Sequence, residues 1–155
     1  MSPGDQLICA FITPLEVGRT FRQWPLHATI VPWLEVRVPQ EKFERLLKQQ
    51  LQKLAPFKSI VRGQTRFGFR TVNLLLKSQW KSLHAHVLTV VRRSTRNKTP
   101  FRFVGKLYTP HVTHQGNAHL NEGDVFWCDA LYIVEQKGTH KAVIAKFKLE
   151  ADNET

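Results

Sequence analysis

The sequence is poor in cysteine and contains no long apolar run. Its 155 residues include 2 cysteines, Cys9 and Cys128, which lie in separate apolar segments and form neither a Cys-x-x-Cys pair nor a metal-ligand spacing, so we expect buried, reduced thiols. No stretch approaches the roughly 18 consecutive apolar residues that a membrane-spanning helix needs. No basic segment precedes the short apolar run 7–12, as a secretory signal would require. We therefore expect a soluble, cytoplasmic protein.

Acidic residues are also scarce. Asp and Glu number 12 against 23 Lys and Arg, which gives a formal net charge of +11 at pH 7. A balance this basic favours polyanionic partners such as RNA, DNA, nucleotides or an acidic membrane surface, although a basic surface also serves solubility alone. The length and the 42% of hydrophobic residues fit one domain with a substantial core. We assign residues 1–150 to that domain and residues 151–155 to a tail.

Two short segments repeat a histidine and a threonine two residues apart, His-Ala-Thr-Ile at 27–30 and His-Val-Thr-His at 111–114. Both lie in stretches that are typical of β-strands. Successive side chains of a strand point to opposite faces, so the histidine and the threonine of each segment share one face. If the two strands face each other, two imidazoles and two hydroxyls surround one small space, which suits metal-free chemistry at a phosphate. The four candidate residues are His27, Thr29, His111 and Thr113.

The hydrophobic pattern around these segments predicts an α+β domain rather than a doubly wound one. Helical spacing predicts a helix over 40–54, after Pro39, and a second over about 78–91, capped by Ser78. A glycine inside one strand, Gly63, suggests a bulge. The strand of the first motif breaks at Pro32, and 34–38 is either a second strand or its continuation. Further strands are expected at 7–12, 58–69, 71–76, 125–134 and 140–149, the last two as a hairpin with Val143, Ala145, Phe147 and Leu149 on its core face.

Other residues are candidates for binding. The aromatic side chains Trp24, Trp33, Tyr108 and Trp127 suit either core packing or stacking against a base, and Trp33 and Tyr108 lie nearest the motifs. Arg66, Arg70, Lys106 and a polar loop at 92–98 with four positive charges suit either an RNA backbone or a solvated face. Residues 116–123 are expected to form another loop.

The seven histidines also raise the question of a metal site, through His84, His86, His111, His114 and His119. Residues i and i+2 of a helix do not share a face, so His84 and His86 are poorly placed to hold one ion together. No carboxylate or cysteine cluster accompanies the histidines. We therefore expect neither a metal nor a cofactor.

Taken together, these segments resemble the 2H phosphoesterase superfamily, specifically its LigT-like 2'-5' RNA ligases and RNA 2',3'-cyclic phosphodiesterases. The resemblance covers most of the chain, in matching order and spacing. It departs from the family pattern at His114, where an apolar residue is usual, and at Gly116, where a basic residue is frequent. The segments that carry it are 7–14 (opening strand), 27–31 (first motif), 69–76 (strand before the second helix), 83–84 (within that helix) and 110–113 (second motif).

The resemblance implies two pseudo-symmetric lobes of antiparallel sheet, with helices outside, flanking a central cleft lined by the two motif strands. It implies a metal-independent enzyme that acts on 2',3'-cyclic phosphates and 2'-5' linkages in RNA or nucleotides. We expect a monomer that does not bind membranes. One histidine would act as base and the other as acid, in an order left open, while Thr29 and Thr113 hydrogen bond the phosphate. Alternatives are a non-catalytic RNA-binding module on the same scaffold, or a phosphodiesterase for a small cyclic nucleotide or ADP-ribose cyclic phosphate.

Overall fold

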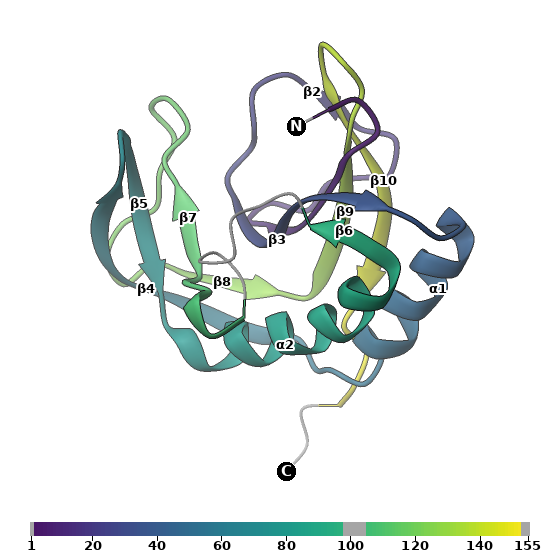
Figure 1. The fold of residues 1–155 in the computed structure, drawn as a ribbon. Coiled ribbons are helices and arrows are strands. Elements are labelled where there is room, and N and C mark those ends of the chain that lie inside the picture. The colour runs from purple at the N-terminus through teal and green to yellow at the C-terminus, as the bar shows by residue number, and fades with distance from the viewer. Residues whose placement is uncertain (1, 98–104, 153–155) are drawn as a thin grey trace.

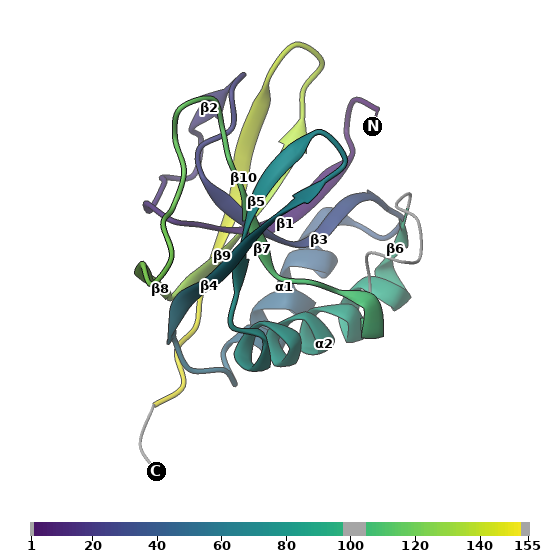
Figure 2. The same cartoon turned by 90° about the vertical axis from the view of Figure 1, so that its left-hand side faces the viewer.

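The computed structural model describes residues 2–97 and 105–152. Its strands form one strongly curled antiparallel sheet, and helices α1 and α2 lie together on one side of it (Figures 1 and 2). The α+β class is therefore confirmed. In chain order the elements are β1 (Gln6–Phe11), β2 (Thr20–Phe21), β3 (His27–Val36), α1 (Gln40–Leu51), β4 (Phe57–Phe67), β5 (Arg70–Leu75), α2 (Lys77–Ser94), β6 (Thr95–Asn97), the 3-10 turn η2 (Gly105–Leu107), β7 (His111–Thr113), β8 (Val125–Cys128), β9 (Ala130–Gln136) and β10 (Lys141–Lys148).

The two motif strands are neighbours at the middle of the sheet. The strand order is β2-β10-β9-β1-β3-β7-β5-β4-β8, and β6 adds to the far end of β3. On one side of the β3–β7 pair lies the wall formed by β1, β9, β10 and β2, and on the other the wall formed by β5, β4 and β8. This gives the arrangement of two halves that the resemblance to the LigT-like family implied.

The main core lies between the sheet and the helices. The apolar stripes predicted for both helices are buried there, because the spacing of these residues places them on one helix face. A second apolar cluster covers the other face of β1, β9 and β10, around Cys9, Phe11 and Tyr132. The buried stripe residues are Phe43, Leu47 and Leu51 of α1 and Trp80, Leu83, Val87, Val90 and Val91 of α2.

Two features of the strands follow from single residues. The strand of the first motif does not break at Pro32 but continues to Val36. Proline has no N–H to donate to a neighbouring strand, and it is tolerated here because the pairing of β3 with β1 is irregular in this stretch. The bulge predicted at Gly63 is present. Gly63 has a φ of 122°, and the register between β4 and β5 shifts between Val61 and Gln64.

Two predictions around α2 are wrong. Ser78 does not cap the helix, because β5 runs directly into α2 and Leu76, whose N–H is bonded to the Ile60 carbonyl, occupies the N-cap position. Residues 92–97 are not a polar loop. Arg92 and Arg93 belong to the last turn of α2, and Arg96 belongs to β6, which pairs with β3. Lys98, the fourth cation of that predicted loop, lies outside the described residues, as do tail residues 153–155.

The predicted strand 125–134 is two strands. β8 pairs with β4 at one end of the sheet, whereas β9 pairs with β1 and β10 in the other half, so the chain crosses between the halves at Asp129. The terminal hairpin of β9 and β10 is confirmed, and Val143, Ala145, Phe147 and Leu149 are buried. The prediction that these four residues share one face is wrong, because the pairing of β10 with β9 shifts register between Val143 and Ala145, so Val143 packs in the second apolar cluster and the other three in the main core.

Both thiols are buried and unpaired, as expected from the sequence. Burial raises the pKa of Cys9, and burial together with the neighbouring Asp129 carboxylate raises the pKa of Cys128 to about 12. Neither α1 nor α2 is long and apolar enough to cross a membrane.

Candidate active site

The pairing of β3 with β7 brings the two motifs together. Ala28 lies opposite Val112 in an antiparallel register, and both side chains are fully buried against the helices. The residues on either side of this pair therefore point to the other face of the sheet. This register places His27 across from Thr113 and Thr29 across from His111, and Cβ atoms of such pairs are about 4.5–5.5 Å apart. We call these four partly buried side chains the quartet.

The two imidazoles are held in the same way. The Nδ1–H of His27 donates a hydrogen bond to the carbonyl of Pro25 at 2.9 Å, and the Nδ1–H of His111 donates to the carbonyl of Thr109 at 2.8 Å. In each case the acceptor lies two residues before the histidine. Because the Nδ1 position carries the proton in both neutral rings, each ring presents Nε2 as the nitrogen available for proton transfer.

Burial makes both rings weak bases. It lowers the pKa of His27 to about 4, against the opposing effect of the Pro25 carbonyl, and the charges of His111 and Arg70 lower it further. Burial also lowers the pKa of His111, opposed by the Thr109 carbonyl. The charges of His111 and Arg70 act on His27 because both groups lie close to it. At neutral pH the free protein holds two neutral imidazoles beside one guanidinium.

An aromatic group positions His27. The indole of Trp24 stacks on its imidazole with ring centroids 4.2 Å apart and planes inclined by 28°. Phe11, the β1 partner of His27, lies at 6.1 Å. Trp33 contacts Trp24 edge-on at 6.2 Å and packs, partly buried, against the second apolar cluster. Trp24 and Trp33 are therefore packing residues that support the His27 side of the quartet.

Phe67 lies beside the other histidine. Its ring meets His111 edge-on, with centroids 4.9 Å apart, and the side chain is 38% exposed. Phe67 pairs with Arg70 across the β4–β5 turn, and strand alternation from Val72, the partner of Thr113, puts Arg70 on the face of the quartet. Phe67 was not among the residues predicted for the site. The signal was its position three residues before Arg70 across Gly68, which a tight hairpin turns into a cross-strand pair.

Two of the candidate contacts point elsewhere. Arg66 pairs with Thr71, one step out of phase with the Phe67–Arg70 pair, so its side chain leaves from the opposite face. Lys106 is exposed on η2, which packs beside α2 on the helical side of the sheet. The prediction that these two cations belong to the site is not supported by this geometry, and Arg70 alone of the three lies on the quartet face.

Tyr108 is buried and is not available to stack against a base. Its hydroxyl donates to the backbone carbonyl of Thr29 at 2.8 Å, and its ring stacks on His84 at 4.0 Å. The His84 imidazole in turn donates from Nδ1 to the Ile30 carbonyl and accepts the Gly105 N–H at Nε2, both at 2.8 Å. Burial lowers the pKa of His84, and this bonding pattern requires the neutral ring. Tyr108 and His84 thus hold the backbone of the first motif by hydrogen bonds to the carbonyls of Thr29 and Ile30.

The remaining histidines form no further cluster at the quartet. His114, on the opposite face from His111 and Thr113, donates from Nε2 to Asn73 at 3.0 Å, and the rings of His114 and His119 lie 5.0 Å apart. Within 2–97 and 105–152, no three His, Cys, Asp or Glu side chains are grouped so as to hold a metal ion. His84 and His86 differ as the helix geometry predicted, because His84 is buried and His86 meets Gln50 of α1.

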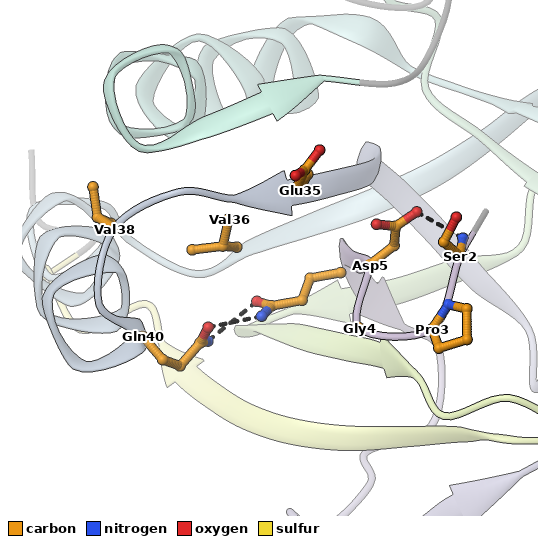
Figure 3. Close-up of a pocket in the computed structure, with 9 residues that line it drawn as sticks. Ser2, Pro3, Gly4, Asp5, Glu35, Val36, Val38 and Gln40 are labelled. Atoms are coloured by element: carbon orange, nitrogen blue, oxygen red, sulfur yellow. Dashed lines mark hydrogen bonds between the residues drawn. The ribbon is translucent and has the colours of Figure 1, made fainter.

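A cavity of about 380 Å³ lies away from the quartet, between the amino-terminal segment, the far end of β3 and the start of α1. Figure 3 shows its lining, in which the side-chain amides of Gln6 and Gln40 bond each other at 2.7 and 3.1 Å. These two amides therefore satisfy each other within the protein. The lining residues are Ser2, Pro3, Gly4, Asp5, Gln6, Glu35, Val36, Val38 and Gln40.

The fold is that of known phosphoesterase structures. The chain is similar to the TT0787 protein of Thermus thermophilus, at 15% identity and a TM-score of 0.61, over 96% of this chain and 100% of that one. It is also similar to E. coli LigT complexed with NADP+, at 13% identity and a TM-score of 0.57, and complexed with 3'-AMP, at 13% and 0.56, each over 97% of this chain and 100% of that one. No family model and no curated protein sequence matches. The chain therefore has the LigT-like fold.

Proposed function

We propose that this protein is a 2H-type phosphoesterase that opens 2',3'-cyclic phosphate ends of RNA or nucleotides without a metal. When a 5'-hydroxyl attacks the phosphorus in place of water, the same opening forms a 2'-5' linkage, which is a reversible ligation. The observation that carries this proposal is the β3–β7 register, which puts two histidines and two threonines on one face around one space. The LigT-like fold supports it, and so do the nucleotide ligands of E. coli LigT. The net charge of +11 fits a polyanionic substrate.

In the proposed mechanism the neutral His27 acts as the base, because its pKa of about 4 keeps it unprotonated. Its Nε2 takes a proton from water as the oxygen attacks phosphorus. The bond from phosphorus to one ribose oxygen breaks, and His111 gives that oxygen a proton from Nε2. Thr29 and Thr113 donate hydrogen bonds to the non-bridging oxygens, where negative charge builds in the transition state. The reaction consumes one water and leaves a phosphate monoester.

The first test is turnover in EDTA. The purified protein is expected to open 2',3'-cyclic CMP and an RNA oligonucleotide ending in a 2',3'-cyclic phosphate, with unchanged rates after chelation, because the quartet supplies both proton transfers. Product is resolved by chromatography against 2' and 3' monophosphate standards. Activity that disappears with EDTA and returns with a divalent ion would contradict the mechanism. RNA binding without turnover of any cyclic phosphate would instead support the non-catalytic binding module.

The pH dependence of kcat/KM follows from the two histidines. The productive free enzyme has His27 neutral and His111 protonated. The fraction with neutral His27 falls below about pH 4, and the fraction with protonated His111 falls above its pKa, which burial holds below the ordinary 6.5. We therefore expect kcat/KM to peak between about pH 4 and pH 6.5 and to fall roughly tenfold per pH unit above that range.

Substrate charge shifts this profile. An anionic phosphate stabilises both imidazolium forms, so both limbs of the kcat profile are expected at higher pH than those of kcat/KM. Steady-state rates across pH 3.5–8.5 measure both. A kcat/KM that stays level from pH 6.5 to 8.5 would show that no protonated histidine is required.

A further inference from the structure

The edge strand β8 presents an exposed apolar face. Val125 is 51% and Trp127 54% exposed, while the alternate residues of the strand, Phe126 and Cys128, are buried. In the pairing with β4, Lys58 lies opposite Trp127 and Ile60 lies opposite Val125. The buried residues of both strands face α2, whose Trp80 bonds Ser59 and contacts Phe126. The exposed face is therefore the one that points away from the helices.

This face continues the face of the quartet. Leu74 of β5 lies opposite His111, whereas the next residue, Leu75, is buried and pairs with the buried Val61 of β4. By strand alternation Ile60 and Lys58 then share the side of Leu74 and His111. In Figure 1, β8 crosses below the space between β7 and β9, with α2 on its other side. The quartet and Trp127 thus lie on the same face of the sheet.

A lysine accompanies the exposed indole on this face. The Nζ of Lys58 lies over the Trp127 ring, 5.8 Å from its centroid. Residues 57–76, which form β4, β5 and their turn, contain no acidic residue, and of their cations Lys58 and Arg70 lie on this face whereas Arg66 lies on the opposite one. Three acidic residues flank β8. Glu122 and Asp124, which precede it, accept hydrogen bonds from the Gly63 and Asn121 N–H groups, and the exposed Asp129 follows it. An exposed indole beside a lysine is a combination with which proteins hold single-stranded nucleic acid.

We infer that Trp127 and Lys58 form a second nucleotide subsite, which binds a base and a backbone phosphate of single-stranded RNA several nucleotides upstream of the reacting end. Trp127 of β8 and His111 of β7 are three strands apart, at about 4.8 Å for each strand spacing, and they are offset by about five residues along the strand direction. The distance between them over the surface is therefore on the order of 20 Å. One nucleotide bound at the quartet does not span that distance, but a short chain does. This inference rests on the proposed function and makes its substrate an oligonucleotide.

The kinetic test compares two substrates that share the reacting group, 2',3'-cyclic CMP and an RNA hexamer ending in the same cyclic phosphate. Trp127→Ala is expected to lower kcat/KM for the hexamer roughly tenfold, as loss of one stacked base predicts, and to change that for the mononucleotide less than twofold. Trp127→Phe should retain most of the hexamer rate. Lys58→Gln should lower hexamer kcat/KM and reduce its dependence on salt, whereas Lys48→Gln, an exposed lysine on α1, should change neither.

A binding assay keeps this inference separate from the proposed function. A labelled hexamer ending in a 3'-phosphate is titrated by fluorescence anisotropy into wild type and Trp127→Ala, which needs no turnover. Weaker binding of the hexamer to the variant supports the subsite even in a protein that hydrolyses nothing. Equal hexamer affinity and equal hexamer kcat/KM in the two proteins would overturn it. So would a dimer in size-exclusion chromatography that Trp127→Ala abolishes, since the face would then be a protein interface.

Discussion

His27→Ala and His111→Ala are each expected to lower kcat for cyclic phosphate opening by roughly 10³-fold, which corresponds to about 4 kcal/mol of activation free energy. The reason is geometric: each ring is fixed through Nδ1 by a backbone carbonyl, so no other group of the quartet takes over its Nε2. Because the two rings act in one step, the double variant should be scarcely slower than either single variant. Single-turnover assays with 2',3'-cyclic CMP measure these rates.

The control for the His27 and His111 variants is a histidine remote from the quartet. His140 lies in the β9–β10 turn, and His140→Ala should turn over at the wild-type rate. Since removal of the His27 ring leaves Trp24 without its stacking partner, His27→Gln is made in parallel, and thermal unfolding confirms that both variants fold. A folded His27→Gln or His111→Ala protein with more than a tenth of wild-type kcat would refute the two-histidine mechanism.

Thr29→Val and Thr113→Val are expected to lower kcat by about 10²-fold each, with little change in KM. Valine is close to threonine in shape, so each substitution removes one hydrogen-bond donor from the oxygens that become more negative in the transition state, an effect of the size seen for single oxyanion donors. The strands themselves should hold their places, because Ala28 and Val112 anchor them in the core. Initial rates over a substrate concentration series separate kcat from KM.

The matched variants for this prediction are Thr29→Ser and Thr113→Ser, which keep the hydroxyl and lose only a methyl group. They should retain most of the activity. A rise in KM with unchanged kcat in the valine variants would mean that the hydroxyls bind substrate and transition state equally, and would remove them from the catalytic step.

The motif and its geometry could be predicted from the sequence because strand alternation is a local property. His27 and Thr29 share a face in any strand, and the apolar residue between them indicates which face is buried. The helices could be predicted for the same reason, because the spacing of residues such as Phe43 and Leu47 is enough to define one helix face. What local pattern did not give was the pairing of β3 with β7, which joins residues 84 positions apart and makes one quartet of two motifs.

The predictions that were wrong concern features that depend on non-local contacts or on strand register. An apolar run at 125–134 looks like one strand, and only its partners, β4 for one half and β1 and β10 for the other, divide it at Asp129. Tyr108 lies near the second motif in sequence, yet its ring is buried in the core, where it stacks on His84 of α2. Arg66 and Arg70 are alike in sequence, and only the turn at Gly68 decides which of them faces the quartet.

The hydroxyl of Tyr108 also links the halves of the molecule. It donates a hydrogen bond to the backbone carbonyl of Thr29 in the first motif, and Tyr108 itself lies three residues before His111 of the second motif. A shift of the 105–110 segment therefore displaces a donor in one motif and an imidazole in the other at once. One hydrogen bond from a buried side chain thus joins the backbone of the first motif to the segment that leads into the second.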